Sequence, residues 1–340
     1  MTDDTHEVVE QWQTLEGILR GYRQSQVLIS ATQLGIFREL SDGPLGADEL
    51  ASRVGADLEA LRRLLAACVA MGLLQEDGQS YANAPLARTC LAKQGRFYMA
   101  NLVAREAAFY RRWDHLTEAV RSGKQPPASL HDEQDSTWVR DFELALLDLA
   151  RVSAPAIAEV LPLPAEGPAR VLDVGGGHGG FSMALVRRHP QVQATVLELP
   201  AAAEVAREIV AAEGMSERVD VQVGDFQQEE LGRDYNLILL FGVLGSESSE
   251  GKLALLRKAY AALAPGGAVA VRGFAYDEQP DGLQDALFSL HLLLSTAAGD
   301  SPTLEELLEA LEEAGFQKAE VIQLPNWIGS RLLVARKPAP

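Results

Sequence analysis

Residues 171–180 read Val-Leu-Asp-Val-Gly-Gly-Gly-His-Gly-Gly, an apolar run that ends in a glycine-rich turn. The run predicts a buried β-strand, and the residues from Phe181 onward predict a helix after the turn. Glycines let the backbone approach a ligand closely, and the N-terminus of the following helix favours negative charge. This stretch therefore predicts an open α/β sheet that binds a dinucleotide or a nucleoside-bearing cofactor at the end of its first strand.

Strands and helices alternate from this turn to the end of the chain, which predicts a largely parallel sheet covered on both faces. The expected strands are Arg170–Val174, Gln193–Leu197, Val219–Val223, Leu237–Phe241, Ala268–Val271, Ala319–Gln323 and Arg331–Ala335. The Pro-containing segment 161–168 precedes the first strand and predicts a domain boundary. We therefore expect one domain at residues 1–164 and a second at residues 165–340.

The front half of the chain reads almost wholly as helix. An apolar helix is expected at Leu58–Met71, and two short strands around Asp77-Gly78 follow it, as in a winged helix. Apart from Arg62 and Arg63 this helix is mostly apolar, so it is poorly suited to reading a DNA major groove. We expect it to expose apolar surface that a partner subunit covers.

The bulk composition narrows the classes of protein. The chain has 340 residues, of which 47% are hydrophobic and 23% charged, as in soluble globular proteins. Its net charge of −18 disfavours binding to nucleic acid. No apolar run approaches the roughly 18 residues of a membrane span, and the acidic N-terminus is unlike a secretory signal, so we expect a cytoplasmic protein. Cys68 and Cys90 match no metal spacing, and Cys68 is expected to be a buried thiol.

Two further motifs follow the next two expected strands. Glu198 lies about twenty positions after the glycine turn, where a carboxylate can accept from both ribose hydroxyls. Asp225 can accept from an adenine amino group, and Phe226 can pack on the adenine ring; nicotinamide enzymes need not have this third element. The predicted cofactor-binding residues are Asp173, Gly175, Gly177, Glu198, Leu199, Gly224, Asp225, Phe226 and Phe241.

These motifs resemble the family of caffeate, flavonoid and acetylserotonin O-methyltransferases and bacterial tailoring enzymes, whose pattern runs LDVGGGxG, DLP, GDFF, PGG and AGF. The matching segments here are Leu172–Gly179, Glu198–Pro200, Gly224–Phe226, Pro265–Gly267 and Ala314–Phe316. The resemblance covers nearly the whole chain and implies a Rossmann-like class I methyltransferase domain preceded by an all-helical, winged-helix dimerisation domain. It also implies S-adenosyl-L-methionine as cofactor, a small natural-product-type substrate, and a homodimer formed through the N-terminal domain.

The catalytic residues that this resemblance implies are missing. The O-methylating members carry a histidine after the fourth strand, where this chain has Gly245, and two glutamates at the places of Gly273 and Ser301. A phenol benefits from such a general base, whereas a carbon nucleophile can attack without one. The chain therefore resembles the bacteriochlorophyllide C-20 methyltransferase, which also lacks the histidine, and we expect C-methylation without a metal.

Several replacement groups keep alternatives open. His291 is the candidate base or substrate-orienting residue, against a purely structural helix histidine. Arg272 could bind a substrate carboxylate or form a structural salt bridge, and Tyr110 and Trp113 could line the substrate pocket or pack in the core. His178 is expected to face solvent. The alternative functions are an O-methyltransferase with another base, a cofactor-binding tailoring enzyme that does not methylate and, more remotely, a DNA-binding regulator.

Overall fold

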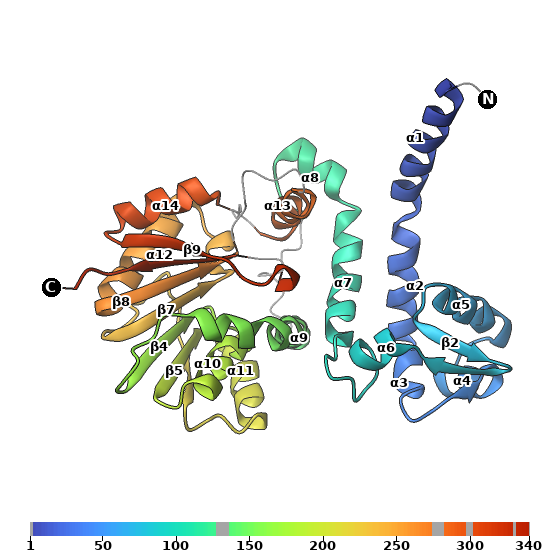
Figure 1. The fold of residues 1–340 in the computed structure, drawn as a ribbon, viewed down its shortest axis with the longest axis horizontal. Coiled ribbons are helices and arrows are strands. Elements are labelled where there is room, and N and C mark those ends of the chain that lie inside the picture. The colour runs from blue at the N-terminus through green and yellow to red at the C-terminus, as the bar shows by residue number, and fades with distance from the viewer. Residues whose placement is uncertain (1–2, 127–135, 274–281, 297–301, 329–330, 340) are drawn as a thin grey trace. The chain divides into compact units, whose positions relative to one another are not determined.

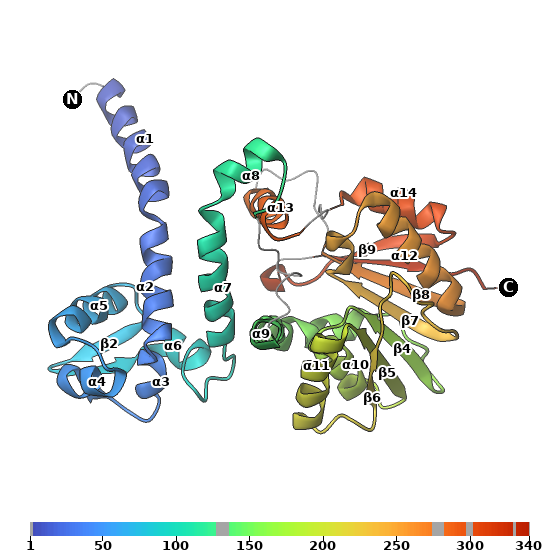
Figure 2. The same cartoon turned by 180° about the vertical axis from the view of Figure 1, so that it is seen from behind.

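The computed structural model describes residues 3–126, 136–273, 282–296, 302–328 and 331–339. The chain forms two compact units, Met1–Ala108 and Phe109–Pro340 (Figures 1 and 2). The boundary expected at 164/165 lies inside the second unit, because helix α9 (Ser136–Val160) packs against two helices of the α/β sheet. Within the described residues, no helix combines the length and apolarity needed to cross a bilayer.

The first unit has the helices and hairpin of a winged helix, as predicted. Its elements are α1 (Asp3–Arg20), α2 (Tyr22–Gln33), α3 (Ile36–Glu39), β1 (Leu45–Gly46), α4 (Ala47–Val54), α5 (Leu58–Ala70), β2 (Leu74–Asp77), β3 (Ser80–Asn83), α6 (Pro85–Cys90) and most of α7 (Ala100–Trp113). The sheet order is β1-β3-β2, all antiparallel. Strand β1 was not expected, because two residues are too short to show an alternating pattern.

The expectation that α5 exposes an apolar face is wrong. Leu61 and Leu65 are buried in the core of the first unit, where α2 and α4 cover them. Cys68 is buried beside them, and burial raises the pKa of its thiol to about 11, which confirms the expected buried thiol. Most of the exposed large apolar side chains described in this unit lie on α1 instead, where Trp12 is 53% and Ile18 75% exposed.

The second unit contains all of the predicted strands in one sheet of order β6-β5-β4-β7-β8-β10-β9. The strands are β4 (Ala169–Val174), β5 (Val192–Glu198), β6 (Val219–Val223), β7 (Tyr235–Phe241), β8 (Leu263–Arg272), β9 (Gln317–Ile322) and β10 (Leu332–Arg336). The helices besides α9 are α8 (Leu116–Ser122), α10 (Gly180–Arg188), α11 (Pro200–Ala212), α12 (Ser249–Ala262), α13 (Leu283–Ser295), α14 (Leu304–Glu313) and the short 3₁₀ helices η1 (Val243–Ser246) and η2 (Asn326–Ile328). Strands β4 to β8 run parallel, and β10 is antiparallel to both neighbours.

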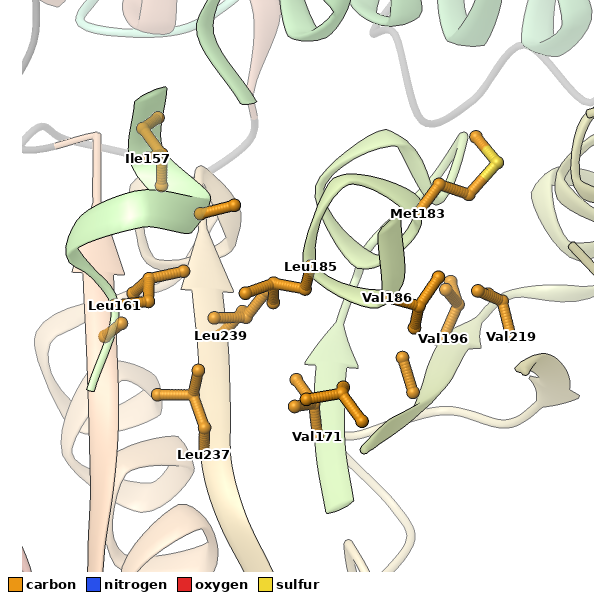
Figure 3. Packing of buried hydrophobic residues seen from close by; sticks show 14 of the residues in the cluster. Ile157, Leu161, Val171, Met183, Leu185, Val186, Val196, Val219, Leu237 and Leu239 are labelled. Atoms are coloured by element: carbon orange, nitrogen blue, oxygen red, sulfur yellow. The ribbon is translucent and has the colours of Figure 1, made fainter. Parts of the chain in front are cut away.

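Helices cover both faces of this sheet, and successive residues of its strands supply separate cores. Val171 and Leu237 belong to the core beneath α9, α10 and α11 (Figure 3), whereas Leu172 and Ile238 belong to the core beneath α12 and α14. Burial on both faces explains why the strands read as continuous apolar runs. The chain leaves β4 toward β5 on one side, and β7 pairs on its other side. The carboxyl ends of these strands therefore meet where the strand order reverses, which is where open α/β sheets bind ligands.

Candidate cofactor and active site

The glycine turn connects β4 to α10 and presents bare backbone. At Gly177 the φ angle is +47°, which favours glycine, and a β-carbon there would coincide with the carboxyl group of Glu143. At Gly176 a β-carbon would lie 2.6 Å from Cγ of Asp173. The Gly175 N–H is fixed by donating to the Leu197 carbonyl at 2.9 Å. No side chain larger than hydrogen fits at Gly176 and Gly177, because the turn packs directly against the carboxyl groups of Asp173 and Glu143.

Asp173 lies beneath the turn, as the last-but-one residue of β4. It is buried and accepts a hydrogen bond from Ser182 Oγ on α10 at 2.8 Å. Burial raises the pKa of its carboxyl to about 7, an effect that the bond from Ser182 opposes. Among the predicted cofactor residues, Asp173 is therefore placed to hold the turn against α10, with its carboxyl directed at protein groups.

Glu198 closes β5 directly beside the turn, as the sequence predicted. One carboxylate oxygen accepts from the Gly177 N–H at 3.0 Å and the other from the Leu199 N–H at 2.8 Å. Burial raises the pKa of this carboxyl, while the two N–H donors lower it. Because each oxygen can accept a further bond, the arrangement leaves Glu198 able to receive two hydroxyl donors. Leu199 itself is half-exposed at the start of α11.

The third predicted element follows β6 and is tied to the second. The Gly224 N–H donates to the Glu198 carbonyl at 3.0 Å. The Asp225 carboxylate accepts from the Gln227 N–H and from the Gln228 side-chain amide, each at 2.8 Å. Phe226 packs against the core beneath α12 and α14. The structure therefore brings the predicted loops together, with Asp225 held in a fixed turn.

Phe241 at the end of β7 and Arg272 at the end of β8 both lie beside Phe181 of α10. Phe241 meets Phe181 edge-to-face at 4.9 Å between ring centroids, and the Arg272 guanidinium lies 5.4 Å from the Phe181 ring centroid. Burial lowers the pKa of Arg272 to about 10. Sequence reasoning predicted site roles for Phe241 and Arg272 but none for Phe181, which was expected only to begin the helix after the turn.

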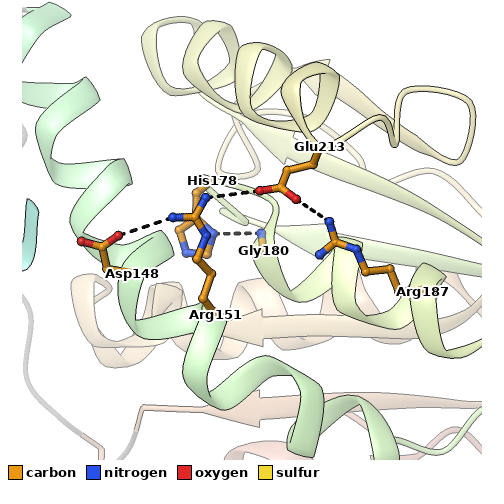
Figure 4. A network of polar contacts seen from close by, with 6 residues as sticks. All are labelled: Asp148, Arg151, His178, Gly180, Arg187 and Glu213. Atoms are coloured by element: carbon orange, nitrogen blue, oxygen red, sulfur yellow. Dashed lines mark hydrogen bonds and ion pairs between the residues drawn. The ribbon is translucent and has the colours of Figure 1, made fainter. Parts of the chain in front are cut away.

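His178 does not face solvent, and that expectation is wrong. Its ring is buried, and Nδ1 accepts from the Gly180 N–H at 2.8 Å. Burial lowers the pKa of the ring to about 3, with a smaller contribution from Arg151. The ring folds back beneath α9 because α9 covers the turn, which local sequence does not reveal. Figure 4 shows the ion pairs around it, which join Asp148, Arg151, Glu213 and Arg187.

The sequence missed Glu143, a buried carboxyl on α9. Its side chain packs against Gly177, and Oε2 has no hydrogen-bond partner among the described residues. Burial raises the pKa of this carboxyl to about 8, helped by the nearby charge of Glu198 and opposed by a bond from the His178 backbone N–H. The available signal was an acidic residue within the apolar pattern of 137–160, between Phe142 and Leu144.

Two of the three positions where the resemblance implies catalytic residues lie in the described part of the chain. Gly245 is buried in η1, and a β-carbon there would lie 3.8 Å from Leu292 of α13, an ordinary contact distance among the described residues. Gly273 has a φ of +92°, and a β-carbon would lie 3.2 Å from the Gly242 Cα, so any side chain is strained there. Ser301 lies outside the described residues.

The candidate base His291 lies on α13, one residue before Leu292. Its ring meets Phe109 edge-to-face at 4.4 Å between centroids and stacks on Phe288 at 6.1 Å. Nε2 is 3.5 Å from Ser295 Oγ. The half-buried Tyr110 and Trp113 follow Phe109 on α7. The sequence had not marked Phe109, the residue of this helix that contacts His291.

These acceptor groups fit S-adenosyl-L-methionine, whose nucleoside offers hydroxyl and amino donors and whose methionyl part carries an ammonium and a sulfonium. Carboxylates at the ends of β5 and β6 suit hydroxyl and amino donors, bare glycine backbone allows close approach, and Glu143 Oε2 supplies an unused acceptor. The fold and this site define a methyltransferase that uses S-adenosyl-L-methionine.

Comparison with known proteins agrees. Residues 113–317 match the O-methyltransferase domain family, and residues 17–93 match the O-methyltransferase dimerisation domain. The chain is 29% identical to the N,N-dimethyltransferase OxyT of Streptomyces rimosus, over 97% of this chain and 98% of that protein. It is 27% identical to the L-tyrosine C(3)-methyltransferase of Streptomyces lavendulae, over 95% and 92% respectively.

Among solved structures, human N-acetylserotonin methyltransferase in complex with SAM superposes with a TM-score of 0.87 at 26% identity, covering 97% of this chain and 98% of that one. The chain belongs to the O-methyltransferase family and carries that family's dimerisation domain.

Proposed function

We propose that this protein methylates a small natural-product-type molecule at an atom that needs no histidine base, with an electron-rich carbon as the first candidate. The observation that carries the proposal is Gly245, a glycine buried in a 3₁₀ helix at the place where the sequence resemblance implies the family's histidine. The positive φ of Gly273 supports it, because a glutamate is disfavoured there as well.

When bound, the cofactor supplies an electrophilic methyl group on a sulfonium. The work left to the protein is to hold an electron-rich atom in line with that methyl group and to exclude competing nucleophiles. A ring carbon forms the new bond with its own electron pair and loses its proton to solvent afterwards, so a positioned base contributes little to the transition state.

An amine nitrogen is the second candidate acceptor. It is favoured by the similarity to OxyT, named as an N,N-dimethyltransferase, over 97% of this chain. A neutral amine also attacks through its lone pair without prior deprotonation. Phenol oxygen differs, because it gains from a base in the transition state.

The test is to find where the methyl group goes. The protein is incubated with methyl-deuterated S-adenosyl-L-methionine and matched panels of electron-rich aromatic, aminated and phenolic compounds. The position of the label in each product is then read by mass spectrometry and NMR. We expect the label on carbon. Labelling of nitrogen would support the second candidate, and labelling of phenol oxygen alone would overturn the proposal.

We also propose that the protein is a homodimer formed through its N-terminal unit. The dimerisation-domain match covers residues 17–93, and α1 just before and within it carries exposed apolar side chains. Those more than 40% exposed on α1 are Val8, Val9, Trp12, Leu15, Ile18 and Leu19. A stripe of this kind is rarely left in water by a monomer.

A further inference from the structure

We propose that Glu143 binds the ammonium group of the methionyl part of the cofactor. This inference rests on the proposed use of S-adenosyl-L-methionine. It adds a residue that the sequence motifs do not contain, because Glu143 lies on α9, well before the glycine turn in the chain.

The carboxyl of Glu143 lies against the glycine turn. Glu143 is 6% exposed, and its carboxyl fills the space that a β-carbon on Gly177 would need. The same Gly177 donates its N–H to Glu198. The carboxyl of Glu143 therefore lies against the turn that the fold uses for its ligand, beside the carboxyl that ends β5.

One oxygen of this carboxyl is an unpaired hydrogen-bond acceptor among the described residues. Oε2 of Glu143 has no hydrogen-bond donor among the described residues, although buried polar atoms are nearly always paired. Among the described residues, the titratable residues that act on this carboxyl are Glu198, through its charge, and His178, through its backbone N–H. His178 is held neutral by burial, so none of these groups supplies a cation.

The chemistry of the cofactor decides which of its groups can pair with this oxygen. The cofactor carries two positive groups, an ammonium and a sulfonium. An ammonium has N–H bonds that can donate to Oε2 of Glu143, whereas a sulfonium has none. Hydrogen bonds between ionised partners are also stronger than those between neutral ones. The ammonium is therefore the group that satisfies Oε2.

Binding of a cation should change the protonation state of Glu143. Burial and the neighbouring Glu198 raise the pKa of Glu143 to about 8, so this carboxyl is largely protonated at neutral pH before a cation binds. A cation favours the ionised form. Binding at pH 7 should thus release a proton from Glu143, while the ligand's own ammonium, with a pKa of about 7.7–8.0 for an α-amino group, stays charged.

The experiment compares the full-length wild-type protein with Glu143→Gln by calorimetry, using three probes: S-adenosyl-L-methionine, S-adenosylhomocysteine and 5′-methylthioadenosine. The first two carry the ammonium, only the first carries the sulfonium, and the third carries neither. Asp148→Asn is the matched control, since it neutralises another buried carboxyl on α9 that pairs with Arg151.

At pH 8 we expect Glu143→Gln to weaken both ammonium-bearing probes by about 10- to 100-fold, the usual range for a charged hydrogen bond. Binding of 5′-methylthioadenosine should change less than about twofold, which also shows that the variant is folded. Asp148→Asn should bind all three probes like the wild type. At pH 7, titrations in buffers of different ionisation enthalpy should show that the wild type releases more protons than Glu143→Gln.

Other results overturn the inference in distinguishable ways. Equal affinities for wild type and Glu143→Gln would exclude a role for this carboxyl while leaving the proposed function intact. A larger loss for S-adenosyl-L-methionine than for S-adenosylhomocysteine would assign Glu143 to the sulfonium. Equal loss of all three probes would make its role structural. A folded wild type that binds none of them would remove the proposed function itself.

Discussion

Nδ1 of His178 accepts a hydrogen bond from the backbone N–H of Gly180 at 2.8 Å, inside the turn that connects β4 to α10. This bond satisfies a donor in the first turn of α10 without using a solvent-facing cap. It also requires the ring to remain unprotonated at Nδ1, in agreement with a pKa lowered by burial to about 3.

The first prediction is a stability loss in mild acid that depends on His178. Keeping the ring neutral carries no penalty above its unfolded pKa of about 6.5, and the penalty grows as the pH falls toward about 3. In His178→Asn the amide oxygen can replace Nδ1 and does not titrate. Between pH 7.5 and 5, the wild type should lose about 2 kcal/mol of unfolding free energy more than this variant.

Urea unfolding of the ligand-free proteins at both pH values measures this difference. His6→Asn, on the exposed surface of α1, is the control and should follow the wild type. If the wild type and His178→Asn respond alike to acid, the buried neutral ring is not what makes the fold acid-sensitive.

The second prediction separates steric closure at Gly177 from backbone strain. Gly177 and Gly214 both have positive φ angles, +47° and +68°, but only Gly177 has a side chain, that of Glu143, against its Cα. Gly214→Ala should cost about 1–2 kcal/mol, the left-handed backbone penalty. Gly177→Ala should cost more and lower cofactor affinity at least tenfold. Chemical unfolding and cofactor titration of both variants check this, and equal behaviour would contradict a close-packed turn.

The third prediction tests the missing base and concerns His291. With a carbon acceptor, His291→Ala should act only through positioning and lower turnover much less than the roughly 10²–10⁴-fold typical of general-base loss. Gly245→His should bring no acceleration, although a β-carbon there comes no closer than 3.8 Å, at Leu292, to the described residues that it faces. Single-turnover rates with the acceptor found in the labelling experiment measure both. A methyl group on oxygen together with a large loss in His291→Ala would identify His291 as a base.

The fourth prediction concerns assembly. The protein should sediment at about twice the chain mass of 36.7 kDa. Placing charges in the apolar stripe of α1, as in the double variant Trp12→Glu/Ile18→Glu, should shift it toward the mass of one chain. Leu308→Glu, which alters an exposed apolar residue of α14 in the other unit, should sediment like the wild type. An unchanged dimer in the α1 variant would place the interface elsewhere.

The sequence by itself determined the α/β sheet, the glycine turn and the carboxylates at the ends of the second and third strands. These signals are local: a doubly buried strand reads as an apolar run, and Gly175–Gly179 and Glu198 follow such runs directly. It also located the winged-helix hairpin, whose turn at Gly78 is read from adjacent residues. The family's motifs added the cofactor, since they name residues one at a time.

Only the tertiary structure decided what covers these local features. His178 is buried because α9 lies over the turn, and α5 is covered because α2 and α4 pack on it, whereas α1 keeps a stripe of exposed apolar side chains. Glu143 reaches Gly177 from a helix that precedes the strand. Burial and pKa depend on which distant segments pack together, and a periodic pattern specifies that a face is buried without specifying what buries it.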